Sequence, residues 1–185
     1  MYRFILALLC AAFFLAGCSS KPPRAEQGGT TLGQAGQEPG ADDTALPTGP
    51  QPQFVDPEDY TGDPAIKAEA MAALRDMYFA HDSASIMPNE EPTLQAIGAF
   101  MKKRTKVAIL VEGHCDERGT EEYNMALGSR RANAAREYLV RQIGIDPNRL
   151  FPISYGEIRP VMPGHDENAW SRNRRAHFRI GQAAE

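Results

Sequence analysis

The sequence has few cysteines, no excess of basic charge and no internal repeats. Three cysteines are too few for a disulfide-rich scaffold, and no cysteine–histidine pair has the spacing of zinc ligands. The 20 Lys and Arg residues are outnumbered by 24 Asp and Glu, which leaves a net charge of −4 at pH 7. Domains that bind nucleic acid are basic, so this balance argues against nucleic acid as a partner. The length of 185 residues allows one domain with additional segments.

Long apolar runs are also missing, apart from residues 4–16 near the start of the chain. That run is too short to cross a bilayer comfortably. It follows Arg3 and precedes small residues, which is typical of a secretory signal peptide. The segment Leu15-Ala16-Gly17-Cys18 resembles the bacterial lipobox, in which the chain is cut before the cysteine and its thiol is acylated. We therefore expect residues 1–17 to be a lipoprotein signal peptide and Cys18 to carry a lipid anchor.

Two alternatives to the lipobox are an ordinary signal peptide with a chance cysteine and a transmembrane helix. Ser19, and not an Asp, follows the cysteine, and by analogy with lipoprotein sorting signals this implies the outer membrane. Processing would remove Cys10 and acylate Cys18. Cys115 would then be the one cysteine left in the exported domain, so we expect no disulfide within the chain.

Residues 18–64 have the composition of a tether. Eight of the 14 prolines and eight acidic residues lie there, with two basic residues and few large apolar side chains. Such a segment cannot bury enough apolar surface to offset the entropy lost on ordering. The sequence predicts a lipidated N-terminus followed by a disordered tether up to residue 64.

Residues 65–185 have the pattern of one α+β domain. We predict helices over residues 65–76, 90–104 and 121–142, a helical turn at 168–173, and strands over 77–80, 107–113, 150–155 and 176–180. Thr120 is a plausible N-cap for the longest helix, and Gly144 ends it. We expect a small mixed sheet with helices packed on one face, in the order β-α-β-α-β-β.

Several segments of this domain, in order along the chain, resemble one family. They are Tyr78–Ser83, Val111–Thr120, Tyr123–Ala132, Ile153–Glu157, Gly164–Glu167 and Asn173–Ala176. Over about residues 77–180 the chain resembles the OmpA-like peptidoglycan-binding domain. Within that family it is most similar to the peptidoglycan-associated lipoproteins, and this resemblance agrees with the lipobox and tether. It departs from the family at Cys115, where Thr is usual, and at His81, where a small or aromatic residue is common.

The residues themselves favour a polar ligand at the end of the second predicted strand. Asp116 follows that buried strand and precedes the longest helix, a natural place for such a ligand. Asn124, Leu127, Gly128 and Arg131 recur at helical spacing and therefore share one face. An Asp and an Arg near one pocket suit a ligand that carries both an ammonium group and a carboxylate. The alternative is that Asp116 and Arg131 pair with each other, or with Arg118 and Glu122.

The resemblance implies a particular ligand and site. The ligand would be meso-diaminopimelate of the peptidoglycan stem peptide, held mainly by Asp116 and Arg131. Further pocket residues would be Asp82, His114, Asn124 and Leu127. Alternatively, Asp82 is a turn cap and His114 a buried strand-end residue. We expect Cys115 to point to the opposite face from its neighbours, and Arg174 or Arg175 to pair with an acid of the 116–122 loop.

We expect a binding protein without catalytic activity, cofactor or metal. It would tether the outer membrane to peptidoglycan, and the resemblance adds a TolB-like periplasmic protein and other Tol components as partners in envelope integrity and cell division. One alternative is a cell-wall peptidase that uses His114, Cys115, Asp116 and Glu117. These residues are adjacent in an extended segment, which does not favour a working Cys–His pair. The other alternative is a periplasmic scaffold that binds only proteins.

Overall fold

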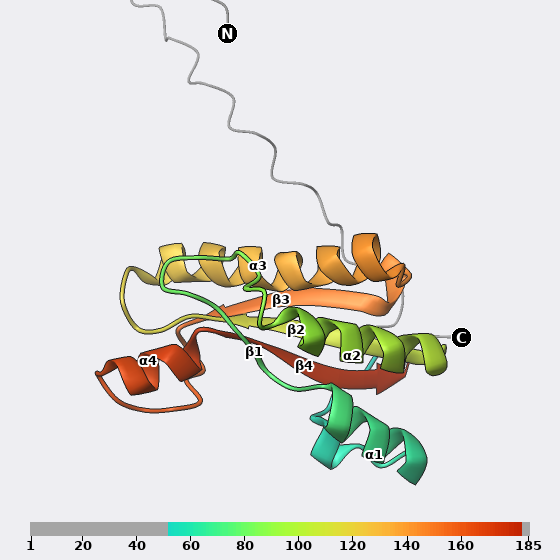
Figure 1. Ribbon diagram of the computed structural model, residues 1–185. Coiled ribbons are helices and arrows are strands. Elements are labelled where there is room, and N and C mark those ends of the chain that lie inside the picture. The colour runs from blue at the N-terminus through green and yellow to red at the C-terminus, as the bar shows by residue number, and fades with distance from the viewer. Residues whose placement is uncertain (1–51, 183–185) are drawn as a thin grey trace, which may run out of the picture. The chain divides into compact units, whose positions relative to one another are not determined.

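The computed structural model describes residues 52–182 (Figure 1). In this part of the chain, one sheet is formed by strands β1 (Met77–Tyr78), β2 (Val107–His114), β3 (Leu150–Gly156) and β4 (Arg175–Gln182), in the order β1-β4-β2-β3. β2 and β3 are parallel, and β4 runs antiparallel to both β1 and β2. The α-helices are α1 (Pro64–Ala73), α2 (Glu91–Lys103), α3 (Glu121–Tyr138) and α4 (Glu167–Asn173). The predicted α+β class with a small mixed sheet is confirmed.

The hydrophobic core lies between the sheet and helices α2 and α3, which run along the same side of it (Figure 1). Alternate residues of β2 supply this core, because side chains of a strand point to opposite faces in turn. The buried residues are Val107, Ile109 and Val111 from β2, Leu94, Ile97 and Met101 from α2, Ala132 and Ala135 from α3, and Phe178 and Ile180 from β4. Helix α1 packs against α2.

Helix α3 approaches the end of β2 very closely, and glycine makes this possible. A Cβ atom on Gly113 would collide with the backbone carbonyl of Gly128. The helix begins where the Thr120 side chain accepts a hydrogen bond from the Tyr123 amide at 3.2 Å, which confirms the expected N-cap. The short loop after β2 is therefore held between the end of the sheet and the first turn of α3.

The domain begins earlier than the sequence predicts. The predicted tether extends to residue 64, yet Val55 pairs with Ile180 of β4 through two backbone hydrogen bonds of 2.9 Å, and the Tyr60 side chain is buried. The physical reason lies in the length of β1, which covers only the first residues of β4 and leaves the rest of that edge open to Val55. The predicted signal peptide, Cys18 and the tether up to residue 51 lie outside the described residues.

Smaller differences concern the ends of elements. β1 stops at Tyr78, although Phe79 still donates its amide hydrogen bond to the Arg174 carbonyl at 2.9 Å. α3 ends at Tyr138 and continues as a π-helical turn over Leu139–Ile143, which Gly144 closes at φ 82°. No helix within residues 52–182 is long and apolar enough to cross a membrane.

Candidate binding pocket

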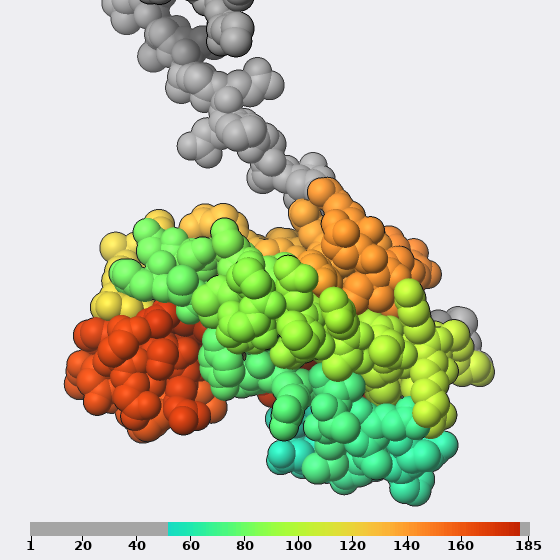
Figure 2. Space-filling view, viewed as in Figure 1, coloured from blue at the N-terminus to red at the C-terminus, as the bar shows by residue number. Residues whose placement is uncertain are grey.

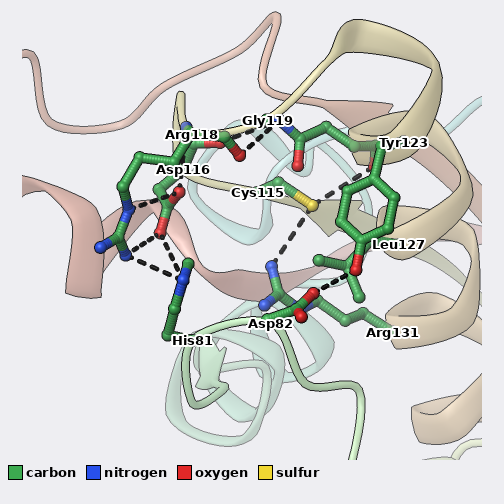
Figure 3. Close-up of a pocket in the computed structure, with 10 residues that line it drawn as sticks. His81, Asp82, Cys115, Asp116, Arg118, Gly119, Tyr123, Leu127 and Arg131 are labelled. Carbon is green, nitrogen blue, oxygen red and sulfur yellow. Dashed lines mark hydrogen bonds and ion pairs between the residues drawn. The ribbon is translucent and has the colours of Figure 1, made fainter.

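A pocket of ≈ 260 Å³ lies at one end of the domain, where three segments meet. These segments are the loop after β1, the loop after β2 and the start of α3. In Figure 2 the loop after β1 (green) adjoins the yellow surface at the start of α3. The lining residues are His81, Asp82, Cys115, Asp116, Arg118, Gly119, Tyr123, Asn124, Leu127 and Arg131 (Figure 3). Five of the six predicted site residues are among them, namely Asp82, Asp116, Asn124, Leu127 and Arg131. A pocket of this volume can hold a group about the size of one amino acid.

Asp116 is the most heavily hydrogen-bonded acid of the pocket. Its Oδ1 accepts from the backbone amide of Arg118 at 3.1 Å and from Arg118 Nε at 3.2 Å. Its Oδ2 accepts from Arg118 Nη2 at 2.7 Å and from Arg174 Nη1 at 3.2 Å. Burial alone would raise the pKa of Asp116, but the hydrogen bonds from Arg118 and Arg174 outweigh burial and hold the pKa below its ordinary value. The carboxylate is therefore ionised at neutral pH.

Arg131 lies across the pocket with its side chain completely buried. Nε donates to the Ser83 carbonyl at 2.8 Å and Nη2 to the Ala80 carbonyl at 3.2 Å. Nη1 donates to the His114 carbonyl at 2.8 Å and lies 3.3 Å from Cys115 Sγ. Burial lowers the pKa of Arg131, yet the side chain remains a cation because arginine starts from so high a value.

The alternative that Asp116 and Arg131 pair with each other is wrong, since no carboxylate within residues 52–182 lies at ion-pair distance from Arg131. The pairing of Asp116 with Arg118 does occur, and so does the expected pairing of a C-terminal arginine, Arg174, with the 116–122 loop. Asp116 and Arg131 thus present a negative and a positive group to the same pocket without neutralising each other.

Asn124 holds the loop after β2 in place. Its side-chain amide donates to the carbonyls of Asp116 at 3.3 Å and Arg118 at 3.2 Å, and also to the Glu157 carboxylate. Leu127, one turn further along α3, adds a buried apolar surface to the pocket. Asn124 therefore fixes the position of Asp116, while Leu127 favours an apolar stretch of ligand.

The rim of the pocket is closed by a contact between the loop after β1 and α3. Tyr123 donates its hydroxyl hydrogen bond to the Asp82 carboxylate, and this bond raises the pKa of Tyr123. Asp82 is exposed and has a φ of 51°, a left-handed conformation that few non-glycine residues adopt. The sequence reasoning did not single out Tyr123, although it stands one turn before Leu127 on the same helix face.

His114 does not reach the pocket, and Cys115 does. The His114 ring is buried and stacks on Tyr155, with ring centroids 5.6 Å apart. Its part in the pocket is its carbonyl oxygen, which accepts from Arg131. Cys115 was expected to point away from the pocket, but it lines the pocket. Strand alternation places it there, because Val111 and Gly113 of β2 face the core and α3, so Cys115 does too, and His114 is the residue that points away.

Cys115 is not poised for nucleophilic chemistry. Its Sγ lies 3.3 Å from the Asn124 carbonyl, and burial raises the pKa of the thiol, so the neutral form persists. His114 lies elsewhere and cannot serve as its base. Within residues 52–182 no group of three or more His, Cys, Asp or Glu side chains is arranged to hold a metal ion. The pocket is suited to non-covalent recognition.

One wall of the pocket was missed by the sequence reasoning. The Arg118 guanidinium lies 4.1 Å from the centre of the Trp170 ring. The Glu117 carboxylate accepts from Trp170 Nε1 at 2.9 Å and lies 2.7 Å from His165 Nδ1. These contacts join the loop after β2 to α4 and the loop before it. In the sequence, only the position of Arg118, two residues after Asp116, indicated that it could contact the Asp116 carboxylate.

Comparison with known proteins identifies a family that this chain matches. Residues 78–174 match the OmpA family. A peptidoglycan-associated lipoprotein of Pseudomonas aeruginosa is 45% identical over 112 residues, which make up 60% of this chain and 64% of that protein. The chain thus covers slightly less than two thirds of this relative. A peptidoglycan-associated lipoprotein of Legionella pneumophila is 33% identical over 174 residues, 94% of this chain and 92% of that protein.

Solved structures agree with the sequence relatives. The crystal structure of the peptidoglycan-associated lipoprotein from Burkholderia pseudomallei is 36% identical, with a TM-score of 0.57, and the match covers 68% of this chain and 99% of that one. The C-terminal domain of Helicobacter pylori MotB shares the fold, with a TM-score of 0.54 at 24% identity, over 58% of this chain and 84% of that one. These relatives are not enzymes, in agreement with the expectation of a non-catalytic protein.

Proposed function

The chain belongs to the OmpA family, and from this membership we propose that it is an outer-membrane lipoprotein that binds peptidoglycan without covalent chemistry. It tethers the outer membrane to the cell wall, with the lipid on Cys18 in the membrane and the domain on the wall. Residues 19–51, if fully extended, span at most about 110 to 120 Å between the two.

The ligand we propose is the free end of meso-diaminopimelate in the stem peptide. The observation that carries this proposal is that Asp116 and Arg131 face one pocket and are not paired with each other. The ammonium group of the ligand is placed against Asp116, with Asp82 at the rim. The carboxylate is placed against Arg131, whose Nη2 has one N–H left beyond its bond to Ala80. Leu127 contacts the methylene chain.

Partners follow from the same membership. We propose a TolB-like periplasmic protein and other Tol components, and a role in envelope integrity and cell division. The peptidase alternative has little support, since the Cys115 thiol is neutral and has no histidine base. The protein-only scaffold remains the competing function, and binding to wall material separates the two.

Sedimentation with purified peptidoglycan sacculi tests the proposal. The soluble chain of residues 19–185 is expected to pellet with sacculi, and Asp116→Asn to remain largely in solution. Glu137→Gln is the matched control, because it removes one carboxylate from the exposed side of α3. Wild type that stays in solution with sacculi would exclude wall binding and favour the protein-only scaffold.

A further inference from the structure

The carboxylate that we assign to the ligand's ammonium group already has cationic partners within the protein. Asp116 is 4% exposed, and its two oxygens together accept four hydrogen bonds, three from Arg118 and one from Arg174. A carboxylate offers about four acceptor positions. An incoming ammonium group therefore has to displace one of these donors.

The two arginines differ in how firmly they are held. The Arg174 side chain is 8% exposed, donates to the Phe79 carbonyl at 3.1 Å and is bound to Glu167 at 2.6 Å. The Arg118 side chain is 32% exposed and stands at the pocket, where Figure 3 shows it beside His81 at the Asp116 carboxylate. Arg118 is therefore the donor that a ligand can displace.

A second position for the Arg118 guanidinium lies close by. Its Nη2 is 3.8 Å from Oε2 of Glu167, the first residue of α4. The guanidinium already lies over the Trp170 ring, which offers a favourable surface for a cation. A small rotation of the Arg118 side chain would thus move its guanidinium from the Asp116 carboxylate to the Glu167 carboxylate.

We propose that Arg118 is a built-in competitor, which occupies Asp116 in the free protein and is displaced across the Trp170 ring towards Glu167 by the ammonium group of the ligand. This inference rests on the proposed function, since it concerns the regulation of the same pocket. The free-energy cost of moving Arg118 lowers affinity for any amine. A ligand with a second contact, such as a carboxylate at Arg131, overcomes that cost, and its binding stays readily reversible.

Arg118→Gln tests the proposal, because it removes the cation but leaves the backbone amide that also binds Asp116. The probe is the tripeptide L-Ala–γ-D-Glu–meso-diaminopimelate, titrated calorimetrically into residues 19–185. At the value of a partly exposed ion pair, this interaction corresponds to roughly two- to fivefold in affinity, so Arg118→Gln is expected to bind the tripeptide that much more tightly than wild type. Arg118→Lys, which keeps the charge without the two-pronged geometry, is expected to fall between them.

Trp170 reports the movement, because it is the single tryptophan of the chain. In wild type, its fluorescence is expected to change with the same concentration dependence as the calorimetric signal. In Arg118→Gln the tripeptide is expected to bind with no such change. Arg141→Gln is the matched control, since it removes an exposed arginine at the far end of α3 and is expected to bind as wild type does.

Equal or weaker binding by Arg118→Gln would overturn the inference and show that Arg118 does not oppose the ligand. An unchanged Trp170 signal in wild type that binds would also overturn it. In both cases wild type still binds, so the proposed function stands. Wild type that binds neither tripeptide nor sacculi would instead overturn the proposed function, and the inference with it.

Discussion

Arg131 donates a hydrogen bond to the backbone carbonyl of His114 at 2.8 Å, and this bond joins the middle of α3 to the last residue of β2. The same guanidinium binds the carbonyls of Ala80 and Ser83 in the loop after β1. One buried cation therefore holds together the two loops that form the pocket. Arg131 therefore holds the loops of the pocket in place and also supplies its positive charge.

Arg131→Ala is expected to destabilise the domain as well as to weaken binding. Three carbonyls lose their donor, and that of His114 is buried, so the free energy of unfolding should fall by about 1–3 kcal/mol. The free energy of unfolding should fall less in Arg131→Lys, because the Lys ammonium group can still donate to some of these carbonyls. Urea denaturation followed by circular dichroism measures both. An unchanged denaturation midpoint for Arg131→Ala would contradict this account of Arg131.

His177 is expected to make stability depend on pH. Its Nδ1 lies 2.6 Å from Asp76 and its Nε2 2.9 Å from Asp56. Burial lowers the pKa of His177, but the two carboxylates outweigh it and hold the pKa above the ordinary 6.5. The protonated ring thus adds stability that is fully present below pH 6.5 and is lost as the pH rises through the folded-state pKa.

The measurement is the free energy of unfolding of wild type and His177→Gln between pH 5.5 and pH 9. The other charged groups around this ring, Glu112, Arg175, Arg179 and His114, are present in both proteins and cancel in the difference. The stability advantage of wild type is expected to be largest at the acidic end. A difference that does not vary with pH would show that folding leaves the pKa of His177 unchanged, and an advantage that grows with pH would show that folding lowers it; both would contradict this account.

Cys115 is expected to resist thiol reagents in the folded protein. Its side chain is buried, and burial also raises its pKa, so little thiolate is present at pH 8. The soluble chain of residues 19–185 contains no other cysteine, which makes the reading unambiguous. Reaction with a chromogenic disulfide should be slow in buffer and rapid in urea. Rapid reaction in buffer would contradict the burial of this thiol.

Residues 52–63 are expected to stabilise the domain. Val55 pairs with β4, and the Tyr60 side chain is 7% exposed. Tyr60 is buried and Val55 partly buried, and together they contribute about 2–3 kcal/mol. A chain that starts at residue 65 should therefore unfold at lower urea concentration than one that starts at residue 52. Equal urea midpoints for the two chains would show that residues 52–63 do not stabilise the domain and belong to the tether.

Local patterns in the sequence predicted most of the elements. The apolar run at residues 107–113 predicted the buried strand β2, and helical spacing brought Asn124, Leu127 and Arg131 to one side of α3. Prediction failed for Cys115 because the His114 side chain was assigned to the pocket. Alternation then put Cys115 on the other face, whereas in the structure Cys115 lines the pocket and His114 stacks on Tyr155.

Other features depend on contacts between distant parts of the chain. Val55 joins the sheet because an edge of β4 more than a hundred residues later is open. The partners of Arg131 in the loop after β1 lie 48 and 51 residues away, so its hydrogen bonds had no local signal. The second cation on Asp116, by contrast, was predicted from the Asn173–Ala176 segment and is confirmed at Arg174.

The central claim is that this pocket recognises an ammonium group and a carboxylate on the same ligand. The most direct test is calorimetric titration of residues 19–185 with two tripeptides that differ only in the third residue, meso-diaminopimelate or L-lysine. The lysine peptide keeps the ammonium group and lacks the carboxylate. We expect binding of the diaminopimelate peptide, at least tenfold weaker binding of the lysine peptide, as for loss of a charged hydrogen bond, and little binding of either by Asp116→Asn. Equal affinity for both peptides, or undiminished binding by a folded Asp116→Asn, would contradict the account.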